Sequence, residues 1–119
     1  MTTLTQGMQT GEFLLSEATG VRSREAVTVT IVGGVALPSG TVVGKITATG
    51  KYLQHLVGAV DGSQNAAGVL YTPLAGTNGD IKATIFARHC EVVTNRLNNG
   101  VAPIAATLTA LTAIGIVCR

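Results

Sequence analysis

The sequence predicts a mainly β protein: a small β-barrel or sandwich-like single domain with one short C-terminal helix and an extended N-terminal arm. Three observations lead to this class. The chain has 119 residues, enough for one domain with one modest core. Short β-branched runs are separated by glycine-bearing turns roughly every ten residues, a rhythm typical of barrels and sandwiches rather than of βαβ units. With two Phe, two Tyr and no Trp, the core must be filled by Val, Ile, Leu and Ala.

The first twelve residues form the expected arm, and residues 13–119 form the β domain. The arm consists largely of Thr, Gln and Gly, with apolar side chains only at Met1, Leu4 and Met8. Ordering a residue costs roughly 1–2 kcal/mol, which these few anchors do not offset. We therefore expect the arm to be mobile when the protein is free in solution.

Two strands are expected in the first third of the domain. Residues 12–16 are a short strand candidate, closed by the turn-like residues 18–20. Residues 26–32 alternate Val or Ile with Thr over most of their length, a period of two in β-branched residues that is the strongest strand signal in the chain. Gly33 and Gly34 then end this strand.

Three further strands are expected in the middle of the domain, separated by tight turns. Pro38 fits the second position of a turn at 37–40, and Asp61-Gly62 forms the centre of another turn at 60–63. The strands between such turns are residues 41–48, 51–53 and 68–71.

Residues 81–88 are the next expected strand, because their side chains alternate in character. One face carries Ile81, Ala83, Ile85 and Ala87, and the other carries Lys82, Thr84, Phe86 and Arg88. Residues 90–93 are expected to continue this strand past a bulge.

One helix is expected near the C-terminus. Pro103 fits the first helical position, where its missing N–H costs nothing. The side chains of Ile104, Leu108 and Leu111 are spaced to form one apolar face, and Gly115 lies where a helix is expected to stop. Residues 116–118 would then finish the fold as a strand.

Charge argues against nucleic-acid binding. The formal net charge is +2, and only 12% of residues are charged, about half the usual share of a soluble domain. The three Lys and five Arg are scattered from Arg22 onward rather than clustered on one stripe, as a phosphate-tracking protein requires. The run Arg22-Ser23-Arg24 is followed at once by Glu25, which favours a solvated surface with an ion pair.

Targeting and membrane signals are not expected in this sequence. The first residues show neither a basic n-region nor an apolar h-region, and the most apolar stretch, 104–117, is interrupted by threonines and Gly115. Cys90 and Cys118 make at most one disulfide, and two such thiols suit a protein made in a reducing cytoplasm. We interpret both as small buried hydrophobes.

No catalytic or metal-binding pattern is expected either. His55 and His89 are 34 positions apart, and neither has a spaced partner for a metal. The run His89-Cys90-Glu91 resembles a nucleophile cluster, but adjacent strand residues point to opposite faces, so His89 cannot readily activate the thiol. The sequence therefore predicts a protein that is not an enzyme and has no cofactor.

The linear arrangement of these segments resembles the lambda-like bacteriophage head decoration protein family. The resemblance covers nearly the whole chain from about residue 12, and each segment alone is only a turn glycine beside a strand. The segments are Phe13-Leu14-Leu15-Ser16-Glu17-Ala18, Arg22-Ser23-Arg24-Glu25, residues 34–44, Gly50-Lys51-Tyr52, Val60-Asp61-Gly62-Ser63, Ala67-Gly68-Val69-Leu70, Arg88-His89 and residues 111–116.

This resemblance implies a structural virion protein, made in the host cytoplasm. Family members are small β-rich domains that form homotrimers on the outer surface of the expanded head, where they cement major capsid protein subunits against internal DNA pressure. The arm is then expected to become ordered on the capsid by adding a strand to the shell. Leu4 and Met8 are an even number apart, so in a strand both would face capsid grooves while Thr3 and Thr5 face away.

A second function class stays open: a soluble β-domain that binds a small ligand or a glycan. Glycan sites usually present aromatic faces, and only Phe13, Tyr52, Tyr71 and Phe86 could supply one.

Overall fold

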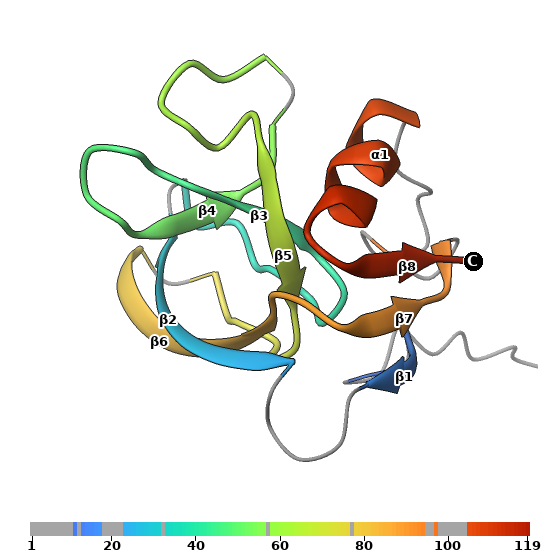
Figure 1. Cartoon of the computed structure of the whole chain (residues 1–119). Helices are drawn as coiled ribbons and strands as arrows, with labels where there is room; N and C mark the ends of the chain where they lie inside the picture. Colours follow the sequence, from blue (N-terminus) through green and yellow to red (C-terminus); the bar gives the residue numbers. More distant parts are fainter. Residues whose placement is uncertain are drawn as a thin grey trace, which may run out of the picture.

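The computed structural model describes residues 11, 13–17, 23–31, 33–56, 58–76, 78–94, 97 and 105–119. These residues form a mainly β fold with a single helix, as predicted (Figure 1). The strands and helix, in chain order, are β1 (Leu14–Glu17), β2 (Arg24–Ile31), β3 (Val42–Lys45), β4 (Tyr52–Gln54), β5 (Ala66–Leu70), β6 (Gly79–Phe86), β7 (Cys90–Val92), α1 (Ala105–Ala113) and β8 (Ile116–Cys118).

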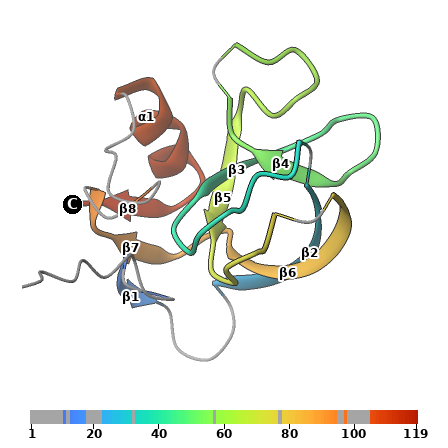
Figure 2. The same ribbon diagram turned by 180° about the vertical axis from the view of Figure 1, so that it is seen from behind.

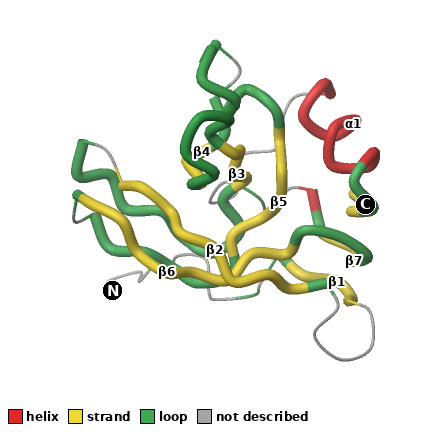
Figure 3. The backbone as a smooth tube through the Cα atoms, turned by 60° about the vertical axis from the view of Figure 1, so that its left-hand side comes forward, coloured by secondary structure: helices red, strands yellow, loops and turns green. Residues whose placement is uncertain are grey.

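Five of the strands close into a barrel in the order β2-β4-β3-β5-β6. The longest strand pairing in the barrel is the antiparallel pair β2–β6. Its register runs without a break from Arg24 opposite Phe86 to Ile31 opposite Gly79. This pair forms the long curved ribbon along one side of the molecule (Figure 3). The barrel closes through a short parallel contact in which Val29 of β2 lies opposite Tyr52 of β4.

The remaining strands form a small sheet in the order β1-β7-β8 beside the barrel. Strand β7 is its centre, antiparallel to β1 and parallel to β8. Helix α1 leads directly into β8 and lies on the same side of the barrel as this sheet (Figure 2). Each of the two outer strands, β1 and β8, therefore has one edge that no other described strand pairs with.

The chain passes from the barrel to the small sheet between Phe86 and Cys90. His89 has a φ of 54°, the left-handed region that non-glycine residues rarely adopt. The hydroxyl of Ser23 donates a hydrogen bond to the His89 carbonyl (2.8 Å), which holds this turn. The prediction that residues 90–93 continue the preceding strand past a bulge is therefore wrong, because the turn at His89 directs them into a different sheet.

Two apolar cores share the barrel wall. One lies inside the barrel and the other between the barrel, the small sheet and α1. Three strands supply neighbouring residues to opposite cores: Val42 and Val43 in β3, Val69 and Leu70 in β5, and Ile85 and Phe86 in β6. These strands are buried on both faces, so their sequences are apolar at consecutive positions rather than at alternate ones.

Helix α1 packs against the second core mainly through Thr107 and Leu111. The predicted apolar face is only partly correct, because Leu108 is half-buried, while Pro103 and Ile104 lie outside the described residues. Gly115 follows the helix with a φ of 92°, as expected of a glycine that ends a helix. In the described part of the chain, no helix has the length and apolarity that crossing a bilayer requires.

The connection between β4 and β5 folds tightly onto β3. A Cβ atom on Gly44 would lie 2.5 Å from the carbonyl oxygen of Ser63, so only glycine allows this approach. Gly62 has a φ of 113°, and a Cβ there would lie 2.5 Å from the carbonyl oxygen of Lys45. These two glycines fix the base of the connection against the barrel wall.

Candidate functional site

The run His89-Cys90-Glu91 does not form a reactive cluster. His89 is exposed, whereas Cys90 is buried in the second core, as their opposite faces predict. Burial, with smaller contributions from Glu17 and Cys118, raises the pKa of the Cys90 thiol to about 11, so the thiolate is scarce at neutral pH. Both cysteines are free; the prediction of burial is correct for Cys90, while Cys118 is half-buried.

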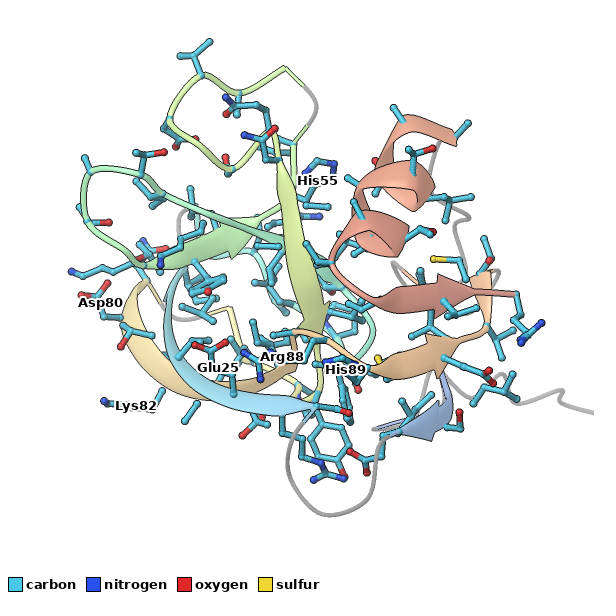
Figure 4. All side chains as sticks on the ribbon, in the orientation of Figure 1. Glu25, His55, Asp80, Lys82, Arg88 and His89 are labelled. Atoms are coloured by element: carbon cyan, nitrogen blue, oxygen red, sulfur yellow. The ribbon has the colours of Figure 1, made fainter. Side chains whose placement is uncertain are left out.

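Most of the described charged side chains are engaged in four surface ion pairs. The pairs are Arg24–Glu17 (2.9 Å), Lys51–Asp80 (2.5 Å), Arg88–Glu25 (3.0 Å) and Arg119–Glu91 (3.1 Å). In Figure 4, Glu25 and Arg88 lie together beside β2 and β6, away from Asp80 and Lys82. Exposed pairs of this kind contribute about 0–1 kcal/mol each, so they solubilise the surface more than they stabilise the fold.

Arg24 pairs with Glu17 rather than with its neighbour Glu25. The contact is bidentate, since the guanidinium donates to both carboxylate oxygens (2.9 and 3.1 Å), and it holds the pKa of Glu17 below its usual range. The same guanidinium lies over the rings of Tyr71 and Phe86. The surface ion pair predicted for the segment 22–25 therefore exists, but Arg24 forms it with Glu17 and not with the adjacent Glu25.

His55 connects the β4–β5 connection to helix α1. Its Nδ1 lies 2.9 Å from the carbonyl oxygen of Ser63, and because a carbonyl only accepts, this nitrogen carries the proton. Its Nε2 lies 3.0 Å from the hydroxyl of Thr107. Figure 4 shows the ring between the connection and the helix. Sequence reasoning examined His55 only as a metal ligand and so missed this structural role.

The four aromatic residues offer no stacking platform for a sugar. Phe13 and Phe86 are fully buried, and Tyr52 is buried within the barrel. Tyr71 is half-buried and packs edge-on against Phe86, with the two ring centres 5.6 Å apart. This placement removes the aromatic faces on which the glycan-binding alternative depended.

The described surface carries an apolar groove with an uncharged lining. It lies between the end of β2, the segment 33–37 and β4, and has a volume of about 310 Å³. Its aliphatic residues are Ile31, Val35, Leu37, Leu53 and Leu56, with Thr30 and Gln54 as the polar members. We call this feature the apolar groove. Val35 and Leu56 are each more than half exposed, so the groove is open to solvent.

A loop beside the groove carries the most exposed large hydrophobic side chain among the described residues. Val60 is 95% exposed, at the tip of residues 58–63, which we call the Val60 loop. In the view from behind, the segment between β2 and β3 passes in front of β4, and this loop projects above both (Figure 2). The sequence identified residues 60–63 only as a turn, although the absence of charge from Leu56 to Val60 was a visible signal.

The predicted arm residues are not part of the groove or of the Val60 loop. Leu4 and Met8 are outside the described residues. The first described residue, Gly11, donates its backbone N–H to the Ser39 hydroxyl (2.9 Å) and accepts a hydrogen bond from the N–H of Leu14 (3.0 Å). The chain is thus attached to the barrel just before β1 begins.

These features define a class of protein. Among the described residues, the Cys90 thiol is buried, the carboxylates are paired or hold turns, and an uncharged groove lies beside an exposed valine. An exposed apolar surface of this kind is typical of a structural or binding module. None of the curated proteins compared with the chain matches it. A family model described as bacteriophage lambda head decoration protein D matches residues 3–116. The chain belongs to this family.

Membership defines the general role. Proteins of this family are structural, non-enzymatic components of the phage capsid that stabilise the head. The resemblance noted in the sequence is therefore confirmed, as is the expectation that the protein is not an enzyme.

Proposed function

We propose that this protein binds the outside of the expanded phage head as a homotrimer and cements neighbouring major capsid protein subunits against the pressure of packaged DNA. The observation that carries this proposal is the family match over residues 3–116. Two features of the fold support it: large apolar side chains that are exposed on the single chain, and edges of β1 and β8 that no other described strand pairs with.

Exposed apolar surface supports self-association. Leu15, Val35, Leu56 and Val60 are all more than 50% exposed. A 119-residue chain with two Phe and no Trp has a modest core, so burying such side chains between copies adds stability that the single domain lacks.

The arm, residues 1–12, supplies the second part of the proposal. It adds a strand to the shell, with Leu4 and Met8 facing capsid grooves and Thr3 and Thr5 facing away. The attachment of Gly11 to Ser39 supports this assignment, because it anchors the segment at the point where the domain begins. An anchored arm reaches only nearby capsid surface, which raises its effective concentration there.

Deletion of residues 2–9 tests the proposal and leaves the Gly11 anchor in place. We expect the truncated protein to keep its melting temperature and oligomeric mass but to lose most of its co-sedimentation with expanded heads. Wild-type protein with unexpanded heads is the negative control, and a variant with Leu4 and Met8 both replaced by Ser separates side-chain seating from backbone pairing. Full binding by the truncated protein contradicts the role of the arm. A monomeric mass on decorated heads contradicts the trimer.

A further inference from the structure

We propose that the contact between copies in the trimer is formed by the Val60 loop of one copy seated in the apolar groove of the next. This inference rests on the proposed homotrimer and adds which two surfaces meet.

The groove favours an uncharged apolar occupant. Its aliphatic side chains come from three separate segments, and its two polar side chains, Thr30 and Gln54, carry no charge. An apolar cavity of roughly 150 Å³ accommodates benzene, so a groove of about 310 Å³ has room for a valine and its flanking backbone. Interface cores are likewise depleted in charged residues.

The loop carries a matching side chain in a fixed position. Val60 is almost entirely solvent-exposed, and the residues on either side of it are held by hydrogen bonds. The Ser63 carbonyl accepts from the Leu56 N–H (3.3 Å) as well as bonding the His55 ring. The Asp61 carboxylate accepts from the N–H (3.0 Å) and hydroxyl (2.6 Å) of Ser63.

A second contact fixes the loop to the barrel. The Asp61 carbonyl accepts a hydrogen bond from the N–H of Thr47 in the β3–β4 hairpin (3.0 Å). A loop already held in one conformation loses little conformational freedom when it docks, which favours association. The bonds that hold this loop therefore suit a surface made for contact rather than a loose turn.

The two patches are adjacent on each copy. Leu56 lines the groove, and its carbonyl accepts a hydrogen bond from the N–H of Ala59, beside Val60. A contact between two different patches is heterologous, and such contacts close into a ring when the rotation between copies permits. Patches that lie side by side on each copy are compatible with such a closed ring of three.

The first test introduces a charge on each side of the contact. Val60→Asp alters the loop and Val35→Asp alters the groove, and both positions are exposed, so each variant is expected to fold with wild-type circular dichroism. We expect each to raise the concentration at which half the protein is trimeric by about tenfold or more, measured by sedimentation equilibrium. Val117→Asp, an exposed valine on β8, is the matched control and leaves that concentration unchanged.

The second test links the two patches covalently. In a Cys118→Ser background, a protein carrying both Val60→Cys and Val35→Cys is oxidised in solution and on decorated heads. We expect covalent dimers and trimers on a denaturing gel. The Val35→Cys single variant, oxidised under the same mild conditions, is the control and should stay monomeric on the gel. The native thiol at Cys90 does not interfere, because it is buried.

The outcomes separate this inference from the proposed function. If wild-type protein is monomeric both in solution and on heads, the trimer itself fails. If wild-type protein is trimeric but Val60→Asp and Val35→Asp remain trimeric at the same concentrations, only the loop-in-groove contact is overturned. If these variants remain trimeric and lose head binding instead, the groove binds the capsid, which also overturns the inference.

Discussion

Replacement of Phe86 by alanine should be among the most destabilising single changes in this fold. Phe86 is fully buried in the second core, on the barrel strand β6, with its ring edge-on to Phe13 and Tyr71 at centre-to-centre distances of 5.8 and 5.6 Å. Truncating a buried Phe to Ala costs about 3–5 kcal/mol. The two ring contacts and the Arg24 guanidinium, 5.2 Å from the ring centre, place the expected loss near the upper end, about 4 kcal/mol.

This loss is large compared with the whole stability of the domain. A chain of 119 residues is expected to have a free energy of unfolding of roughly 6–18 kcal/mol. Urea denaturation followed by far-UV circular dichroism measures the change. With a dependence on urea near 2 kcal/mol per molar, the midpoint of Phe86→Ala should fall by about 2 M. All variants must be compared at one protein concentration, because association adds to the apparent stability.

Two control variants make this result specific. Phe86→Leu keeps most of the buried volume and loses the ring contacts, so it should cost roughly 1–3 kcal/mol. Val117→Ala, on the exposed side of β8, should change stability by no more than about 0.5 kcal/mol. A loss below about 1 kcal/mol for Phe86→Ala, or two separate unfolding transitions in the wild type, would refute the reasoning, because the barrel and the small sheet would then not share this residue.

Three further predictions follow from other parts of the fold. Gly44→Ala should destabilise the protein by about 1–3 kcal/mol, because its Cβ would lie 2.5 Å from the Ser63 carbonyl oxygen, whereas Gly58→Ala, with nothing within 4 Å, should be neutral in the same urea assay. Hydrogen bonds from Ser63 hold the pKa of Asp61 below its usual range, so the ionised carboxylate stabilises the folded state. This contribution to the free energy of unfolding is present above the unfolded-state pKa, near 4, and is lost as pH falls through the folded-state pKa. Asp61→Asn should therefore flatten the acid side of the stability profile, and an unchanged profile would count against this. With a pKa raised to about 11, the thiol of Cys90 should react with a maleimide at pH 8 only after unfolding; in a Cys118→Ser variant, where Cys90 is the remaining thiol, rapid labelling of the native protein would contradict its burial.

The sequence predicted most elements of the fold, because local patterns determine them. The alternation of Val and Thr before Ile31 and the glycine after α1 are local signals, and the strand and helix they predict occur close to the expected positions. The expected strand at 41–48 is shorter, ending at Lys45, because the chain turns there to meet the β4–β5 connection.

Tertiary relationships were not accessible from these patterns. The alternation in residues 81–88 predicts Phe86 on the polar face of its strand, but a second core outside the barrel covers that face. The left-handed turn at His89 has no signature in sequence, since glycine is the residue usually expected at such a backbone angle. The apolar groove joins residues from 30 to 56 that no linear spacing connects, so only the fold brings them together.

The unbroken β2–β6 register has a mechanical consequence. Its eight residue pairs lie side by side along the barrel wall (Figure 3). A force applied along the strand axis loads the hydrogen bonds of such a ladder together, so they must fail at once. A force applied across the strands opens them one after another, from the end. The same domain is therefore strong in tension along one direction and weak in peeling along another, and its unfolding rate under load depends on how it is held.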